Sequence, residues 1–332
     1  MRVNKIISKR GYRKESSWHL VYEWEDILAE ELGLLINIDS RVSLWIKEQC
    51  NKLRLTSIYN LFKSKKDLSL LYIMTVSVEK DCELNKSVIP IIIDFWLKEE
   101  ELPSFYEAYK YVPFILISSA EVFEFLKSKN CPLKIHHWPL SYPDKYKITG
   151  NEHFEKKWDL VLIGRNNPYF IRFLDKYCET HPEFIYVYGT ADINNRQFMT
   201  NKGVYVGDAI GRENYLKMVE SAKIVFYSTP GCDEAKEGAN GYNQVTPRFF
   251  ECLSNGCLIM AHYTINPDTD YYDLQSFGVD ISDYNIFESE LNRLRQLPNP
   301  SMKVYSDYLS LHYTSSRIQS LKSILKNQNI IA

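Results

Sequence analysis

The chain has 332 residues, of which 45% are hydrophobic and 25% charged. This composition excludes wholesale disorder, and the length predicts two domains of ordinary size. A formal net charge of −2 excludes the strongly basic surface that nucleic-acid binding normally needs, so any site for an anion must be local.

The cysteines and the N-terminal residues indicate a cellular compartment. Seven cysteines are scattered without a CxxC pair, which argues against a disulfide framework or a zinc site and favours a reducing compartment. The N-terminus lacks the apolar core of a signal peptide, and the longest apolar run, around Val88–Trp96, is far below the ~20 residues that span a bilayer. We therefore expect a cytoplasmic protein that neither crosses a membrane nor is exported.

The N-terminal half alternates between strand and helix patterns. Gly33 can end the first helix because glycine adopts the left-handed conformation readily. The expected elements are strands at Val3–Ile7, Leu34–Ile38, Leu71–Val76, Val88–Phe95 and Phe114–Ser118, with helices at Ser17–Leu32 and Ala120–Lys127. This order predicts a Rossmann-like α/β domain over residues 1–148.

Two basic segments occur in this half. Lys9–Ser17 follows the first expected strand and is either a solvated end or a contact for an anionic group. Asn51–Lys66 is basic and places Leu55, Ile58, Leu61 and Phe62 on one helical stripe. That stripe predicts either an ordinary amphipathic surface helix or a helix that rests on anionic lipid.

A linker separates the two halves. The segment Cys131–Lys157 holds three prolines and one glycine among polar residues, including His136 and His137. Such a composition is typical of a connecting segment. We place the domain boundary near Tyr146–Glu155, so that the second domain covers residues 149–305.

The C-terminal half shows the clearest alternation of short apolar strands with helices. The expected strands are Asp159–Gly164, Phe184–Gly189, Gly203–Gly207, Ile224–Thr229 and Cys257–His262, and the expected helices are Tyr169–Glu179, Asn214–Ser221 and Thr246–Ser254. This pattern predicts a parallel sheet with crossover helices. A last helix, at about Ser301–Lys326, is expected to pack back across both domains, so residues 306–332 form a segment of their own.

Loops after the strands are the candidate sites, because open parallel sheets bind ligands beyond the carboxyl ends of their strands. The first strand of the second domain ends at Gly164 and Arg165. Gly164 permits close approach to the backbone, and Arg165 can pair with a phosphate through two hydrogen bonds. An ordinary turn is the alternative.

A polar loop of about fifteen residues leads into a clearly delimited helix. Thr246 is expected as its N-cap, Pro247 as its first residue and Gly256 as its left-handed stop. Polar groups suited to a sugar come from Asn240, Tyr242, Asn243 and Gln244. A loop of this size inside a compact domain is usually a binding loop.

Arg248 and Glu251 share one face of this helix because they lie three positions apart. A carboxylate there can accept both hydroxyls of a ribose, while the helix dipole and Arg248 favour a diphosphate. The alternative is a surface ion pair on a purely structural helix.

The segment VTPRFFECLSNGCLIMA, from Val245 to Ala261, resembles the donor-site signature of group-1 GT-B glycosyltransferases. Three further segments resemble parts of the same domain: DLVLIGRNN (159–167), VYVGDAIGRENYLKMVESAKIVFYST (204–229) and LHYTSSRIQSLKSIL (311–325). The resemblance covers about half of the chain and is closest to the spore-maturation-type subgroup. It implies a GT-B fold, in which two Rossmann-like domains face each other across a cleft.

The resemblance also implies roles for single residues. It assigns Glu251 to the donor ribose, Arg248 and the Gly164–Arg165 loop to the diphosphate, and Tyr205–Gly207 to the nucleobase pocket. Thr246, Asn243 and Gln244 complete the expected donor site. Asn243 stands where many retaining members carry a glutamate, so both retaining and inverting transfer stay open.

An inverting transfer requires a general base that deprotonates the acceptor hydroxyl. Asp94, at the end of the run IPIIID, is the preferred candidate, and His19 is the second. A turn-capping aspartate and a structural histidine are the alternatives. No DxD-type motif is suitably placed, so we expect no cofactor and no obligatory metal.

Together these features predict a glycosyltransferase that moves a sugar from a nucleoside diphosphate sugar to a glycan or lipid-linked glycan. The resemblance suggests bacterial surface polysaccharide (capsule or lipopolysaccharide) assembly as the setting, with peripheral contact to the inner membrane surface and without nucleic acid. A nucleotide-sugar 2-epimerase of the same fold and a non-catalytic sugar-binding protein are the alternatives.

Overall fold

The computed structural model describes residues 1–55, 58, 66–79, 81–190 and 196–331, which form two compact units. Unit 1 comprises Met1–Lys145 and His312–Ala332, and unit 2 comprises Tyr146–Leu311. The sequence boundary was placed at 148/149, with residues 306–332 as a separate segment. In the structure the end of the chain returns to unit 1.

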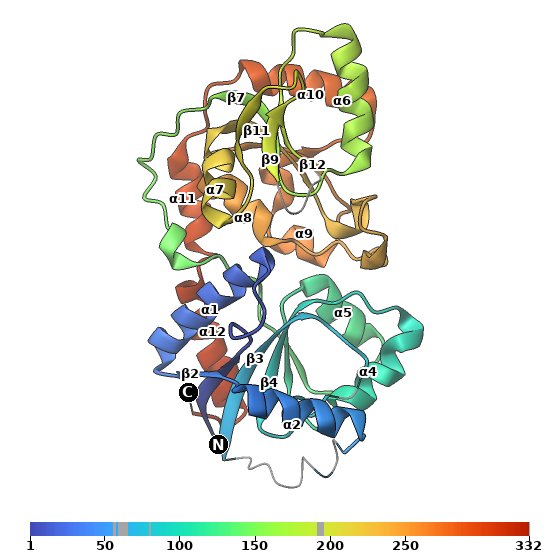
Figure 1. Cartoon of the computed structure of the whole chain (residues 1–332), viewed down its shortest axis with the longest axis vertical. Coiled ribbons are helices and arrows are strands. Elements are labelled where there is room, and N and C mark those ends of the chain that lie inside the picture. Colours follow the sequence, from blue (N-terminus) through green and yellow to red (C-terminus); the bar gives the residue numbers. More distant parts are fainter. Residues whose placement is uncertain (56–57, 59–65, 80, 191–195, 332) are drawn as a thin grey trace. The chain divides into compact units, whose positions relative to one another are not determined.

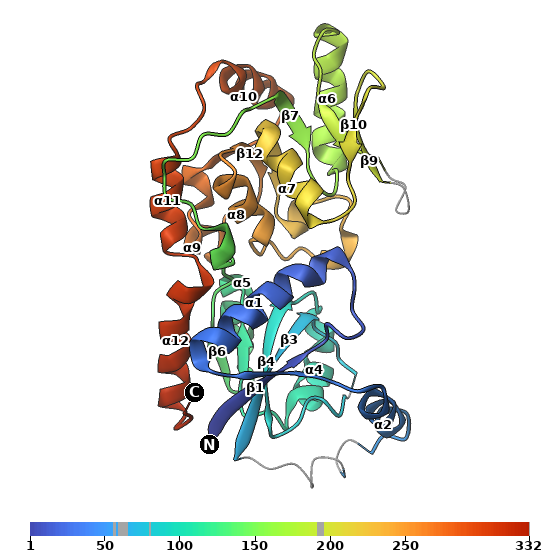
Figure 2. The ribbon, with the colours of Figure 1, turned by 60° about the vertical axis from the view of Figure 1, so that its left-hand side comes forward.

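Unit 1 is built on a six-stranded parallel sheet with the strand order β2-β1-β3-β4-β5-β6. Figures 1 and 2 show α1 and α12 on one face of this sheet and α4 and α5 on the other. The strands are β1 (Arg2–Ser8), β2 (Leu35–Ile38), β3 (Asp67–Thr75), β4 (Val88–Asp94), β5 (Ile115–Ile117) and β6 (Ile135–His137), and the helices are α1 (Ser16–Leu32), α2 (Arg41–Lys52), α4 (Leu102–Tyr109), α5 (Ala120–Ser128) and α12 (Thr314–Asn327).

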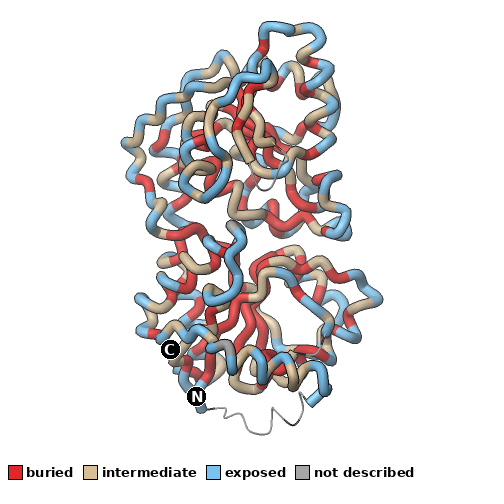
Figure 3. The backbone as a smooth tube through the Cα atoms, in the orientation of Figure 1, coloured by how far each residue is buried: buried red, intermediate tan, exposed pale blue. Residues whose placement is uncertain are grey.

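The strands of unit 1 follow from their sequence. β4 is buried from Val88 through Ile93 and β3 from Leu68 through Tyr72, as the red stretches in Figure 3 show. Continuous apolar runs are typical of parallel strands covered on both faces. Helix α1 ends at Gly33, whose φ of 63° lies in the left-handed region, so the expected stop is confirmed.

Three elements of unit 1 lie where no element was expected from the sequence. β6 falls inside the segment interpreted as a linker, α2 falls between the second and third expected strands, and α4 falls between the fourth and fifth. The expected helix at Asn51–Lys66 lies mostly outside the described residues. None of the described helices is long and apolar enough to cross a bilayer.

Unit 2 contains a seven-stranded sheet with the order β10-β9-β8-β7-β11-β12-β13. Its strands are β7 (Trp158–Leu162), β8 (Val187–Gly189), β9 (Gln197–Thr200), β10 (Tyr205–Asp208), β11 (Ala222–Ser228), β12 (Leu258–His262) and β13 (Gly278–Asp280). Its helices are α6 (Pro168–Thr180), α7 (Arg212–Ser221), α8 (Pro247–Ser254), α9 (Pro267–Tyr271), α10 (Tyr284–Gln296) and α11 (Met302–Ser310).

The predicted parallel sheet is confirmed for most of unit 2, and one edge differs from it. β9 runs antiparallel to both β8 and β10. Only the short turn between Thr200 and Tyr205 joins β9 to β10, and a parallel crossover needs a dozen residues or more. A hairpin is therefore the arrangement that this connection allows.

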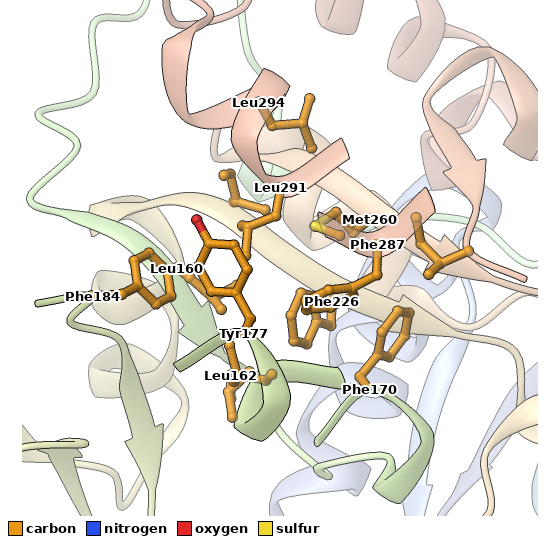
Figure 4. Packing of buried hydrophobic residues seen from close by; sticks show 13 residues of the cluster. Leu160, Leu162, Phe170, Tyr177, Phe184, Phe226, Met260, Phe287, Leu291 and Leu294 are labelled. Atoms are coloured by element: carbon orange, nitrogen blue, oxygen red, sulfur yellow. The ribbon is translucent and has the colours of Figure 1, made fainter. Parts of the chain in front are cut away.

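The core of unit 2 lies between its sheet and the helices α6 and α10. Figure 4 shows Phe170 and Tyr177 of α6 packed with Phe226 of β11 and Phe287 of α10. The Phe170 and Phe226 rings stack with centroids 4.6 Å apart. Burying aromatic side chains of this size supplies much of the stability that holds the strands, and the loops after them, in place.

The expected last helix is two helices. α11 ends at Ser310 in unit 2 and α12 begins at Thr314 in unit 1. Between them the carbonyl of His312 accepts a hydrogen bond from the amide of Tyr142, and Thr314 donates its amide to the carbonyl of Tyr142. These bonds use backbone groups that one continuous helix would have used itself.

Candidate functional site

The candidate site of unit 2 lies where the strand order reverses. From β7 the chain passes through α6 to β8 on one side, and from the neighbouring strand β11 it passes through α8 to β12 on the other side. The loops after β7 and β11 therefore diverge at the carboxyl edge of the sheet, which is the usual ligand position in open α/β sheets. Helix α8 follows the second of these loops and begins at the same edge.

Helix α8 begins as the sequence predicts. Thr246 is the N-cap with extended backbone, Pro247 is the first helical residue, and Gly256 adopts a φ of 67° after the end. The Thr246 side chain does not cap the helix; its amide instead donates to the Tyr227 hydroxyl at 3.0 Å. The hydroxyl of a core tyrosine thus fixes where this helix starts.

Gly164 and Arg248 lie in direct contact. Gly164 has a φ of 74°, and a β-carbon at this residue would lie 2.2 Å from Nη2 of Arg248. No larger residue could take this position without moving the guanidinium. The sequence analysis selected the two residues separately, and the structure brings them together.

Arg248 is a partly buried cation without a partner among the described residues. Neither an ion pair nor a hydrogen bond reaches its guanidinium there, although the neighbouring cations are engaged. It lines a small pocket together with Asn166 and Ser228. The buried Oδ1 of Asn166 likewise accepts no hydrogen bond from the described part of the chain. An anion bound here would meet a desolvated positive charge at the start of a helix.

The loops around this pocket are tied together. Arg165 pairs through Nε with Oδ2 of Asp233 at 2.9 Å, so this expected phosphate contact is engaged within the unit. Asn167 caps α6 and donates to the carbonyl of Cys232 at 2.9 Å. Arg196 donates to the carbonyl of Gly164, also at 2.9 Å. These bonds hold the loop after β7 against the loop after β11.

Glu251 is buried, with its carboxylate held from two sides. Arg212 donates to Oε1 at 2.6 Å and Tyr215 donates to Oε2 at 2.8 Å. Burial disfavours the charged form of Arg212, but Glu251 outweighs it and holds the pKa of Arg212 above its ordinary value. Burial, and then Glu251, raise the pKa of the Tyr215 hydroxyl well above its usual range, so this hydroxyl stays a proton donor.

Both residues that hold Glu251 were missed by the sequence analysis. Arg212 and Tyr215 lie on α7, and Arg212 also donates through Nε to the Tyr146 hydroxyl at 3.0 Å. They are 39 and 36 positions away from Glu251. No spacing rule links positions so far apart, and Arg196 was missed for the same reason.

The polar loop after β11 is compact. The Asn243 side chain accepts from the Thr229 hydroxyl at 2.6 Å and donates to the carbonyl of Gly241 at 2.8 Å. Gln244 is buried beside it. The structure therefore places Asn243 as a brace of the loop, and its role toward a donor, like that of Gln244, stays a prediction.

Tyr205 and Gly207 lie on the edge strand β10. Gly207 pairs with Phe198 at the end of the strand, on the side of the sheet where Arg196 reaches the Gly164 carbonyl. Tyr205 is exposed and donates its hydroxyl to Asp208 at 2.9 Å. Their expected part in a nucleobase pocket stays a prediction.

The candidate bases lie in unit 1. Asp94 is the last residue of β4 and is partly buried, and His19 is exposed on α1. The basic loop between β1 and α1 is largely neutralised, since Arg10 pairs with Glu25 and Asp26 at 3.1 and 2.8 Å. Among the described residues no group of histidine, cysteine or carboxylate side chains has the arrangement of a metal site.

Comparisons with known proteins give matches only among solved structures. No family model matches the chain, and no curated protein matches it. The subgroup expected from the motifs therefore rests on those motifs alone.

Solved structures do match. An alpha,alpha-trehalose-phosphate synthase (UDP-forming) from Burkholderia vietnamiensis has a TM-score of 0.52 at 10% identity, over 96% of this chain and 85% of that chain. A putative UDP-N-acetylglucosamine 2-epimerase from Listeria monocytogenes has a TM-score of 0.52 at 9% identity, over 98% of this chain and 96% of that chain.

The pneumococcal O-GlcNAc transferase GtfA, solved with UDP and GlcNAc, has a TM-score of 0.49 at 12% identity over 82% of this chain, and the match spans 59% of its length. At 9% and 10% identity, the two matches with TM-scores of 0.52 show the fold alone. The chain has the α/β architecture of two Rossmann-like domains that GT-B glycosyltransferases share.

Proposed function

We propose that this protein is a glycosyltransferase that transfers a sugar from a nucleoside diphosphate sugar to a glycan or lipid-linked glycan. The observation that carries the proposal is Arg248, a desolvated guanidinium at the switch point of unit 2 that contacts Gly164 and has no partner in the described residues. Such a group stabilises a bound diphosphate, and more so as negative charge grows on it when the glycosyl bond breaks.

The proposed donor site extends from Arg248 to Glu251. A carboxylate has about four lone-pair sites, and Arg212 and Tyr215 occupy one on each oxygen. The remaining lone pairs can accept the two ribose hydroxyls. Arg212 and Tyr215 then act as positioning residues, because they fix the direction in which Glu251 presents its oxygens.

The fold comparison supports a nucleotide-sugar substrate as a class. The similar structures include a synthase described as UDP-forming and a putative UDP-N-acetylglucosamine 2-epimerase. Both names contain UDP, so UDP is the first nucleotide to test. The assignment to the spore-maturation-type subgroup and to bacterial capsule or lipopolysaccharide assembly is part of the proposal and rests on the sequence motifs.

The proposal is tested by calorimetry with a panel of nucleoside diphosphates, followed by product analysis with the matching nucleotide sugars in buffer that contains EDTA. We expect one diphosphate to bind and its sugar to release the free nucleotide when an acceptor is added, without a divalent metal. If an isomeric nucleotide sugar forms instead, the protein is an epimerase. If no nucleoside diphosphate binds, neither enzyme function holds.

Asp94 is proposed as the general base, with His19 as the second candidate. Asp94→Asn removes the basic oxygen but retains the size of the side chain, so we expect transfer to slow by about 100-fold while nucleotide affinity stays unchanged. Steady-state rates and calorimetry on one preparation separate the two effects. Full activity of Asp94→Asn together with a slow His19→Asn would transfer the role to His19.

A lipid-linked acceptor would bring the protein to a membrane. Peripheral contact with the inner membrane surface is therefore part of the proposed function.

A further inference from the structure

Unit 1 contains a cavity of about 770 Å³ beside its sheet. Leu71 and Ile73 alternate along one face of β3 and form an apolar floor, together with Tyr109 of α4. Figure 1 shows α2 and α4 on the same side of β3 and β4. The volume lies within the range of about 300–1,000 Å³ that is typical of small-molecule sites.

A polar rim borders this cavity at the carboxyl end of β3, where open parallel sheets bind their ligands. It consists of the last residue of the strand and three residues of the loop after it: Thr75, Ser77, Glu79 and Asp81. The cavity therefore combines an apolar floor with a polar rim. A sugar ring has both kinds of surface, because its C–H groups are apolar and its hydroxyl groups are polar.

The carboxylates of the polar rim have acceptor sites to spare. Asp81 accepts through Oδ1 from the side chain of Asn51 at 3.0 Å and from the amide of Glu83 at 2.9 Å. Among the described residues, nothing donates to Oδ2 of Asp81 or to the carboxylate of Glu79. Burial, and then the nearby Asp81, raise the pKa of the Tyr109 hydroxyl above its ordinary value. The rim thus favours a ligand that donates hydrogen bonds.

Three described cations line the cavity without making it an anion site. Lys9 lies 3.6 Å from the carboxylate of Glu83, and Lys52 pairs with Glu48 at 2.7 Å. Arg54 is exposed just after α2, where solvent screens its charge. An acidic ligand would meet the unneutralised carboxylates of the rim, and like charges placed side by side disfavour binding.

We propose that this cavity binds the receiving end of the acceptor, as a hydroxyl-rich saccharide unit without an acidic group. Its hydroxyls donate to Glu79 and Asp81, and its C–H groups lie against the apolar floor. Thr75 is the register partner of Asp94 on β4, so the proposed base lies on the same face of the sheet as the polar end of the cavity. The inference rests on the proposed function, because only a transferase has an acceptor.

The test is binding of the full chain, without nucleotide, to an array of immobilised glycans. The array carries four kinds of terminal sugar at equal density: neutral, amino, carboxylated and phosphorylated. We expect binding to neutral or amino sugars, and binding to the carboxylated and phosphorylated ones that is weaker by about 10-fold or more.

Two substitutions connect the binding to the cavity. Glu79→Gln retains the size of an exposed side chain and removes its charge, so binding should weaken by about 10-fold with the fold retained. Thr75→Trp fills the polar end of the cavity and should abolish binding. Glu31→Gln is the matched control, because it replaces an exposed carboxylate of α1 on the other face of the sheet. Thermal unfolding verifies that each variant is folded.

Three results would overturn the inference: stronger binding to acidic sugars, binding to no glycan of the array, or equal binding by the native chain, Glu79→Gln and Thr75→Trp. Calorimetry with nucleoside diphosphates on the same preparations separates this inference from the proposed function. A protein that binds saccharides in this cavity but no nucleoside diphosphate retains the site and loses the proposed function. A protein that binds a nucleoside diphosphate but no saccharide loses this inference alone.

Discussion

The two sheets differ in whether the cation at the carboxyl edge forms an ion pair with a carboxylate. In unit 1, Arg10 follows β1 and lies 3.1 Å from the buried carboxylate of Glu25. In unit 2, Arg248 lies against Gly164 and forms no ion pair with a carboxylate within the described ranges. Two sheets of similar topology therefore provide a neutralised edge in one unit and an unneutralised charge in the other.

The difference indicates which unit binds an anion. Burial acts against the charge of Arg248, and Tyr215, Cys252 and Glu251 nearby raise its pKa, but no carboxylate forms an ion pair with it in the described structure. A bound diphosphate supplies the counter-charge. Arg10 gains nothing from an anion, because Glu25 already supplies one.

Glu251→Ala tests the paired cation of unit 2. Arg212 has only 15% of its side chain exposed, and the substitution leaves it buried without its carboxylate. We expect the free energy of unfolding to fall by about 3–5 kcal/mol, measured by urea denaturation. Glu234→Ala is the control, because its pair with Arg172 is exposed and should contribute less than about 1 kcal/mol. Equal losses in both variants would contradict the buried role of Glu251.

Arg248→Met tests the unpaired cation. A hydrogen bond to a charged group contributes about 1.5–3 kcal/mol, so we expect the Kd for the bound nucleoside diphosphate to rise by about 10- to 100-fold. Because the cation has no partner in the described structure, the free energy of unfolding should not fall. Calorimetry and urea denaturation measure the two quantities.

Arg10→Met is the matched substitution in unit 1 and should give the opposite result. Its removal leaves the Glu25 carboxylate with only the Ser8 hydroxyl, 2.5 Å away, so stability should fall while nucleotide affinity is retained. If Arg10→Met weakened nucleotide binding as much as Arg248→Met, the distinction between the two sheet edges would be wrong.

Much of the fold could be predicted from the sequence, because buried parallel strands such as β3 and β4 appear in it as apolar runs. The elements that were missed or wrong depend on contacts that a local pattern does not contain. The polar side of α2 is held by Asp39 and Glu83, and the α11–α12 break depends on Tyr142. Each partner is distant in the sequence or belongs to another element.

Only some residues of the candidate site could be predicted from the sequence. Gly164, Arg248 and Glu251 lie in segments with local signals: a strand end, a helix start and a spacing of one helical turn. Arg212 and Tyr215 have no such signal, because the sequence does not show that α7 packs beside α8. Local patterns therefore predict residues that are expected to contact a ligand, but they do not predict Arg212 and Tyr215, which orient Glu251.

Gly164→Ala separates the contact with Arg248 from backbone strain. The new methyl group would meet the guanidinium at 2.2 Å and force it to move, so we expect nucleotide affinity to fall by about 10-fold, besides about 1 kcal/mol of stability from the positive φ. Gly203→Ala is the control: its φ is also positive, at 79°, but nothing lies within 4 Å. It should lose the same stability and no affinity.

Acid should distinguish the two units through a buried histidine of unit 1. Burial, and then the Arg317 guanidinium that donates to its Nδ1, lower the pKa of His312 in unit 1 to about 3. The folded imidazole is neutral, whereas the unfolded one binds a proton below about pH 6.5. Stability from this group is therefore complete above that pH and is lost as the pH falls toward 3, by about 1 kcal/mol per pH unit. We expect hydrogen exchange to show β6 and α12 losing protection before β11 and β12 between about pH 6.5 and 4. His312→Asn should reduce the pH dependence and leave the part that comes from His137 of β6, whose pKa burial lowers to about 4. His19→Asn, which removes an exposed imidazole, should leave the pH dependence unchanged. A loss that began in unit 2 in both variants would show that His312 does not set the order.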